Sequence, residues 1–286
     1  PGPAPTLELP TRRGRVRVWD GGDRPVAEWR SEPSIALRVV SALAPSADGG
    51  MWAIDRNHGI LRFDAAGRVA ATWPISRAYA IADLGGRILV ADEITRQTRV
   101  FEPDGQLVGP LLLDGGTPLP ARYRMAPGHA GQTVFLLGPD TTLERLDLAT
   151  GRLEILARRG IQKGSNESII GLAAFDDGGV VVADGALDRL QIFGPNGVPP
   201  RVLGFDPLLP CDPDTNLQSP RGVVAEAGGT MIAIDHEAHR LRRFGRDGAL
   251  LAAWGESGAA PGMLRAPAVV AQGAAGELWV EDSPLS

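Results

Sequence analysis

The two ends of the chain carry complementary parts of one repeat, and this constrains the fold more than any other feature. A first unit pairs an aromatic residue or leucine with a partner ten positions later, around a turn, and occurs six times: Trp19/Trp29, Phe63/Trp73, Phe101/Leu111, Leu146/Leu156, Phe193/Leu203 and Phe244/Trp254. A second unit places an apolar residue twelve positions before an acidic or small one, also six times: Leu43/Asp55, Ala80/Asp92, Ala126/Gly138, Leu172/Asp184, Val223/Asp235 and Val270/Asp282. The chain begins with the first unit and ends with the second. Joining the ends therefore completes a sixth repeat and predicts a closed ring.

One repeat, residues 222–254, shows what each unit folds into. Short apolar runs alternate with turns at 227–229 and 246–248, and Asp235 follows the second run. Gly, Asp and Asn tolerate the positive φ that hairpin turns require, so each unit is expected to be a β-hairpin. Two hairpins in a repeat of about 40–50 residues are typical of a propeller blade. We therefore predict an all-β fold, a single six-bladed β-propeller with four-stranded antiparallel blades.

Ring closure gives the terminal segments a role. A free sheet edge exposes unpaired N–H and C=O groups. We expect residues of about 14–30 to pair with residues of about 267–282 and complete the last blade. The alternation of Arg15, Val16, Arg17 and Val18 predicts valines toward the neighbouring blade and arginines toward solvent. The tryptophans at matching positions, such as Trp52 and Trp279, are expected to pack between blades.

Several repeats resemble NHL repeats. The segments that carry this resemblance are Asn57-His58-Gly59-Ile60, Val90-Ala91-Asp92 with Arg99-Val100-Phe101, Val182-Ala183-Asp184 with Arg189-Leu190-Gln191-Ile192-Phe193, Ser219-Pro220-Arg221-Gly222-Val223-Val224 and Ala238-His239-Arg240-Leu241. The resemblance covers nearly the whole chain after residue 13 and implies a six-bladed NHL-type propeller, while it implies almost nothing about function. The third blade departs most, with Gly138 where Asp is usual and Leu146 in place of the aromatic residue.

Composition narrows the classes of function. The net charge of −5 argues against non-specific binding to nucleic acid or anionic membranes. Cys211 is the only cysteine, which excludes an intrachain disulfide and a cysteine zinc cluster. No apolar run reaches the roughly 18 residues of a membrane span. We expect a Pro-rich tether at residues 1–13, one domain at 14–286, a monomer, and, because no initiating Met is present, an exported protein of the periplasm or the secreted fraction.

The connections that follow the acidic residues and the connections between blades should open on the same face of the ring. The connections between blades vary in length, and the longest, 205–219, contains Cys211, Asp212 and Asp214. Variable loops on a regular scaffold usually carry binding specificity. We therefore predict that this face holds the functional site.

The repeat register yields candidate residues at the channel mouth. One residue before the Gly222 position the blades offer Ser41, Ala78, Arg124, Ile170, Arg221 and Ala268, and three residues earlier Arg38, Ile75, Ala121, Glu167, Gln218 and Arg265. The predicted ligand-binding set is Arg38, Arg77, Tyr79, Tyr123, Arg124, Glu167, Arg221, His236 and Arg265. Several guanidinium groups at one mouth would bind a carboxylate or phosphate. The alternative is that each arginine pairs with an acidic neighbour and joins two blades.

Catalytic interpretations receive less support from the residues. Six-bladed lactonases and esterases hold a divalent cation with oxygen ligands. The nearby oxygen donors are Glu32, Asn166, Glu167, Asp212 and Asp214, while Arg124 and Arg221 would repel the ion. We therefore expect no metal and no other cofactor. The repeated Asp series is expected to accept backbone N–H groups, since a residue repeated by symmetry has a role repeated by symmetry.

The sequence thus favours an exported, non-catalytic binding propeller for a protein or a small anionic ligand. The alternative is an enzyme at the channel mouth, a lactonase-like or esterase-like hydrolase or a lyase, in which His236 would act in acid–base catalysis.

Overall fold

The computed structural model describes residues 15–20, 24–30, 40–75, 77–128, 131–195, 200–204 and 216–282. The predicted tether at 1–13 and most of the 205–219 loop, with Cys211, lie outside these residues. A short 3₁₀ helix, η2 (Pro139–Thr141), lies between two strands of the third blade. Across the described ranges, no helix has the length and apolar character that crossing a membrane requires.

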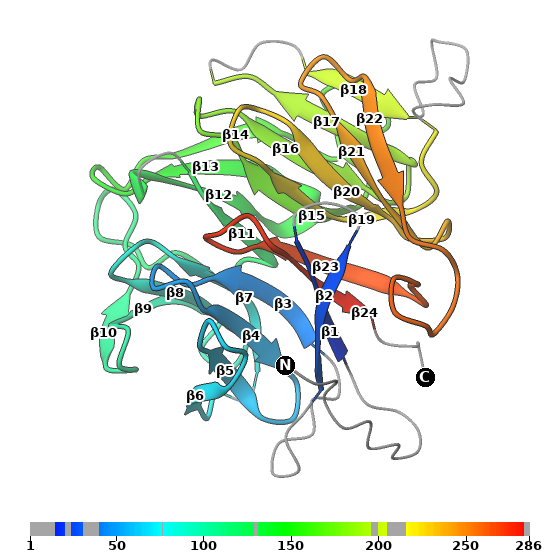
Figure 1. Cartoon of the computed structure of the whole chain (residues 1–286). Coiled ribbons are helices and arrows are strands. Elements are labelled where there is room, and N and C mark those ends of the chain that lie inside the picture. Colours follow the sequence, from blue (N-terminus) through cyan, green and yellow to red (C-terminus); the bar gives the residue numbers. More distant parts are fainter. Residues whose placement is uncertain are drawn as a thin grey trace.

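Six four-stranded antiparallel sheets form the molecule (Figure 1). Blade 1 is β3 (Val40–Pro45), β4 (Met51–Asp55), β5 (Gly59–Phe63) and β6 (Val69–Trp73); blade 2 is β7 (Ala78–Asp83), β8 (Ile88–Asp92), β9 (Gln97–Phe101) and β10 (Leu107–Pro110); blade 3 is β11 (Arg124–Pro127), β12 (Thr133–Leu137), β13 (Leu143–Asp147) and β14 (Leu153–Ala157). Blade 4 is β15 (Ile169–Ala174), β16 (Val180–Asp184), β17 (Arg189–Phe193) and β18 (Arg201–Gly204); blade 5 is β19 (Pro220–Ala225), β20 (Met231–Asp235), β21 (Arg240–Phe244) and β22 (Leu250–Trp254); blade 6 is β23 (Pro267–Gln272), β24 (Leu278–Asp282), β1 (Arg15–Trp19) and β2 (Pro25–Arg30). The predicted six-bladed β-propeller is confirmed.

The last blade is built from both ends of the chain, as the repeats predicted. β1 pairs with β24, with Val18 opposite Trp279, and β2 forms the outer edge of the same sheet. Figure 1 shows the blue strands β1 and β2 beside the red strands β23 and β24. The innermost strands β3, β7, β11, β15, β19 and β23 each contact the next, and β23 contacts β3. The ring is therefore closed by backbone pairing between the terminal segments.

The hydrophobic core lies between adjacent blades. Trp52 and Trp73 of blade 1 pack together at a ring-centroid distance of 4.7 Å and share a cluster with Ile81 and Val90 of blade 2. Trp279 of blade 6 packs in the same way with residues of blade 1. The predicted packing of these tryptophans between blades is confirmed, and it fills the wedge that two twisted sheets leave open.

The prediction for the first strand was half right. Val16 and Val18 are buried against blade 1, as expected. Arg17 is not solvent-facing: it is only 1% exposed, it donates to the carbonyl groups of Ala259, Ala260 and Met263, and its Nε lies 3.6 Å from Asp282. The reason is that β1 is the third strand of its blade, so both of its faces are covered. Arg17 holds the connection from blade 5 to blade 6 in place.

Candidate functional site

The two faces of the ring differ in their connections. The loop face carries the second-to-third-strand loops and the connections between blades, whereas the turn face carries the hairpin turns. At the loop face the repeated aspartates accept backbone N–H groups within or next to their own blade. The pairs are Asp55 with Asn57 and His58, Asp92 with Ile94, Asp184 with Glu167 and Ser168, Asp235 with Gln218, and Asp282 with Arg265 and Ala266. Their predicted structural role is confirmed.

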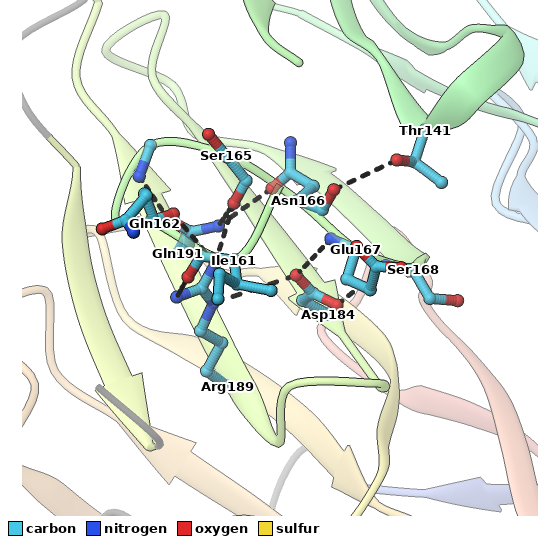
Figure 2. Close-up of polar contacts among 11 residues, drawn as sticks. Thr141, Ile161, Gln162, Ser165, Asn166, Glu167, Ser168, Asp184, Arg189 and Gln191 are labelled. Atoms are coloured by element: carbon cyan, nitrogen blue, oxygen red, sulfur yellow. Dashed lines mark hydrogen bonds and ion pairs between the residues drawn. The ribbon is translucent and has the colours of Figure 1, made fainter. Parts of the chain in front are cut away.

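The connection into blade 4 shows how firmly these loops are held (Figure 2). Arg189, which is fully buried, donates to the carbonyl groups of Ile161, Gln162 and Ser165 at 2.8–3.1 Å. Gln191 donates to the Ser165 carbonyl at 2.6 Å. A loop fixed by this many bonds presents its side chains with little ordering cost on binding, so the face is preorganised.

The third blade replaces the missing aspartate with a different acid. A side chain on Gly138 would lie 2.5 Å from the Glu144 carboxylate, so Glu144 already occupies the space of the usual Asp. Glu144 accepts from Arg122 Nε at 2.7 Å, and both side chains are buried. The exception at Gly138 is thus compensated within the blade.

The structure corrects the alignment of the inner strands. The hairpin turn of blade 2 is one residue shorter than that of blade 1, and that of blade 3 is one residue longer, as the bonds Ser46 to Gly50, Leu84 to Arg87 and Gly128 to Thr133 show. A constant spacing of twelve residues therefore misaligns the innermost strands of blades 2 and 3 by one residue each.

Two candidate positions change as a result. Ala78 pairs with Asp92 as Pro220 pairs with Asp235, so Tyr79 rather than Ala78 matches Arg221. Arg124 pairs with Leu137 as Gly171 pairs with Ala183, so Arg124 occupies the Gly222 position. The other blades have Ala42, Ala80, Gly171, Gly222 and Val269 at that position.

Arg124 lies in a small chamber at the loop-face end of the channel. This loop-side chamber has a volume of about 70 Å³, and Arg124 is the charged residue of its lining. Arg124 Nε donates to the Ile170 carbonyl at 3.0 Å and Nη1 to the Tyr123 carbonyl at 2.8 Å. Burial lowers the pKa of Arg124, yet a guanidinium stays protonated in proteins. Within the described residues no carboxylate pairs with it.

Arg221 and His236 form a second basic group on blade 5. Arg221 Nε is buried and has no hydrogen-bond partner, and no ion pair of Arg221 occurs in the described part of the chain. His236 is buried, and its Nδ1 lies 2.7 Å from the Pro267 carbonyl. Burial lowers the pKa of His236, and the charge of Arg221 lowers it further. The imidazole is therefore neutral at pH 7, with Nδ1–H donating to the carbonyl.

Two predicted tyrosines come together across blades 2 and 3. The rings of Tyr79 and Tyr123 are 5.4 Å apart and tilted by 60°. Burial raises the pKa of Tyr79, and the carboxylate of Glu93, which accepts a hydrogen bond from it, adds to the effect. Arg77 Nε lies 3.6 Å from the same carboxylate and is largely exposed. Glu93 is the member of this cluster that the sequence did not reveal.

The remaining candidates form no hydrogen bond or ion pair with Arg124, Arg221 or the tyrosine pair in the described part of the chain. Glu167 pairs with Arg159 at 2.6 Å, and Arg265 is exposed with no ion pair among the described residues. Arg38, Glu32, Asp212 and Asp214 lie outside the described residues. Asn166 is fully buried and its amide oxygen accepts from Gln191 at 2.9 Å. In the described ranges, no three His, Cys, Asp or Glu side chains gather to hold a metal.

A second, larger chamber lies at the turn-face end of the channel, which the sequence did not indicate. This turn-side chamber has a volume of about 460 Å³. Six apolar residues, one from each blade, line both chambers and separate them: Leu43, Ile81, Met125, Leu172, Val223 and Val270. We call these six the apolar ring. A signal was present in the short alanine-rich stretches of the innermost strands, such as Ala173-Ala174, because small side chains leave space along the axis.

Comparison with known proteins adds support for the fold alone. No protein-family model matches the chain, and no curated protein sequence matches it. The NHL resemblance therefore remains an interpretation of the sequence.

Several solved structures do resemble it. They include a streptogramin B lyase (13% identity, 85% of this chain and 90% of that chain, TM-score 0.55) and the nidogen/laminin complex (14%, 84% and 92%, TM-score 0.59). Virginiamycin B lyase from Staphylococcus aureus is also similar (13%, 90% and 84%, TM-score 0.57). At these identities the likeness shows the fold alone, a β-propeller.

Proposed function

We propose that this propeller is a non-catalytic binding protein that recognises a small anionic molecule at the loop-face end of its channel. The observation that carries the proposal is that Arg124 and Arg221 lie at this end without a carboxylate partner among the described residues. Sequence analysis had left structural pairing with acidic neighbours as the alternative. In the part of the chain that the structure describes, these two arginines have no such partner, whereas Arg122, Arg159 and Arg189 do.

The surroundings of Arg124 favour the binding of an anion. A charge that is partly removed from water and contacts only neutral carbonyl dipoles is incompletely compensated. A bound carboxylate or phosphate would supply the missing countercharge and accept hydrogen bonds from the remaining guanidinium N–H groups. Arg221 Nε lacks even a carbonyl acceptor among the described residues, although it is buried. Both groups favour an anion over a neutral or cationic ligand.

The test is anion binding to the purified protein, with acetate and inorganic phosphate as probes and calorimetry as the measurement. Arg124→Gln and Arg221→Gln should each weaken binding roughly 10- to 100-fold, since hydrogen bonds to charged groups contribute about 1.5–3 kcal/mol. Arg87→Gln is the matched control, because Arg87 is an exposed arginine in a turn on the opposite face. Anion affinity that is equal in all four proteins, or absent at 100 mM phosphate, would contradict the proposal.

A lyase or hydrolase at the same mouth is the second candidate, and His236 is the observation that favours it. A neutral imidazole next to Arg221 has the residue types of a general base beside an anion-binding group. Two of the similar structures are lyases by title, one of streptogramin B and one of virginiamycin B. Incubation with a streptogramin B substrate, followed by chromatography, decides between the two functions. Turnover that His236→Gln abolishes would establish the enzyme, and no turnover would leave the binding function.

A further inference from the structure

We propose that the whole channel is one binding site for an amphipathic anion, with its carboxylate at Arg124 and an aliphatic tail that passes through the apolar ring into the turn-side chamber. This inference rests on the proposed function and adds the chemical class of the ligand. The six residues of the apolar ring line both chambers, so the two spaces adjoin along the axis of the ring. We place the aliphatic tail of a ligand bound at Arg124 across this ring, in the larger chamber.

The lining of the turn-side chamber selects an apolar tail. Apart from Ser46, Asp83 and Gln272, its lining consists of aliphatic residues, alanine, proline, Met125 and Gly85. A chamber of about 460 Å³ is within the range of about 300–1,000 Å³ that small-molecule pockets occupy. The three polar residues lie toward the turn face, so the apolar ring in the middle of the channel presents no polar side chain.

Charge gives the ligand its direction. Asp83 is the acidic residue in the lining of the turn-side chamber, and it accepts bonds from Trp52 Nε1 at 3.1 Å and from the Gly85 amide at 2.8 Å. An anionic head would be repelled at that end and attracted by Arg124 at the other. The charged lining residues are therefore of opposite sign at opposite ends of one apolar passage. An anion with its tail toward the turn face is the arrangement that satisfies both.

The entrance is consistent with this direction. Tail-first entry from the loop face keeps the charged head in water until it reaches Arg124, so no charge has to cross the apolar ring. Tyr79 is the second residue of β7, and Tyr123 directly precedes β11, so both lie at the loop-face end of their blades. Their paired rings place amphipathic side chains at this mouth. Met125, which is half-buried, is the most adaptable member of the ring, because a thioether chain fills irregular spaces.

The experiment is a chain-length series with acetate, hexanoate and dodecanoate, measured by calorimetry below the concentration at which dodecanoate forms micelles. Complete burial of a methylene is worth about fourfold in affinity. We expect dodecanoate to bind at least roughly 30-fold more tightly than hexanoate, which allows for incomplete burial of the tail. Dodecanol should bind at least roughly 10-fold more weakly than dodecanoate, because it lacks the charge that Arg124 recognises.

Variants separate the head site from the tail site. Arg124→Gln should lower the affinities for acetate and dodecanoate by the same factor. Met125→Trp should remove the gain from chain length, so that in this variant dodecanoate binds no more tightly than acetate, and Leu172→Phe is the second blocking variant if Met125→Trp does not fold. Val108→Trp on the exposed outer strand β10 is the control for an added tryptophan. Each variant is accepted for comparison only if its melting temperature matches that of the parent.

The outcomes distinguish this inference from the proposed function. If acetate and dodecanoate bind with equal affinity and Arg124→Gln weakens both, the anion site stands and the channel inference is overturned. If dodecanol and dodecanoate bind equally well, the assignment of the head to Arg124 is overturned. If no anion of any length binds, both proposals are overturned together.

Discussion

Arg124 and Arg221 lie at the same end of the channel but occupy different positions of the repeat. Arg221 belongs to a segment that resembles an NHL repeat, whereas Arg124 enters a position that is glycine, alanine or valine in every other blade. Its long side chain extends to the Ile170 carbonyl of the next blade. Arg124 thus places a fixed positive charge in the channel at a position where every other blade has a small, uncharged residue.

His236 predicts a dependence of stability on pH. Burial, and next the charge of Arg221, lower the pKa of His236 below 6.5 in the native protein. As the pH falls below about 6.5, His236 therefore binds a proton more readily in the unfolded chain than in the native protein. The contribution of His236 is therefore complete above about pH 6.5 and is lost as the pH falls through the lower, native pKa. We expect the melting temperature of the parent to fall more steeply between pH 7 and pH 5 than that of His236→Gln. Parallel curves in a phosphate-free buffer would show that this histidine is not coupled to folding.

At the scale of the element, the third blade makes the sharpest prediction. Gly138 has φ −80° and ψ −176°, a conformation open to any residue, so its neighbours and not its backbone decide what fits. Gly138→Asp would restore the usual acid but place two carboxylates in one buried space. We expect it to lower the unfolding free energy by about 3 kcal/mol, measured by urea denaturation.

Two further variants check the reason for that loss. The double variant Gly138→Asp with Glu144→Ala should recover part of the stability, because Arg122 can then pair with the new aspartate. Gly86→Asp is the control, since a side chain at Gly86 meets no other atom. A Gly138→Asp protein as stable as the parent would mean that Glu144 does not occupy the aspartate position.

The sequence predicts the features of this fold that depend on local patterns. Hairpin turns, alternating strands and the aspartate series are local patterns, and each predicted its element correctly. The errors arose where one residue more or less in a turn shifts the register, as at Ala78 and Arg124, because side chains alternate between faces. Arg17 was misplaced for another reason: alternation shows that two faces differ but not whether a loop covers the polar one. The chambers depend on the distance across the ring, which no local pattern records.

At the scale of the molecule, the terminal strands should control stability. β1 contributes Val16, Val18 and Trp19 to the contacts between blades, and Trp19 is only 1% exposed. Deletion of residues 1–30 removes these side chains and leaves the edge of β24 unpaired, so we expect loss of cooperative melting and aggregation. Deletion of residues 1–10 should leave the melting temperature unchanged. Equal melting temperatures for both truncations would show that the ring does not need its terminal strands.

The pairing of β1 with β24 also sets the order of events when the protein is made. Val18 must find Trp279, some 260 positions later in the chain, so the contact that finishes the molecule is among those most distant in sequence. Loop-closure entropy opposes such contacts, and folds that depend on them are slow to form. During synthesis β1 emerges before the other described strands, and in its own sheet it has only β2 as a partner until β24 has been made. The edge of β1 that pairs with β24 therefore stays unpaired until β24 has been made. Its exposed backbone N–H and C=O groups are open to incorrect pairing during that time.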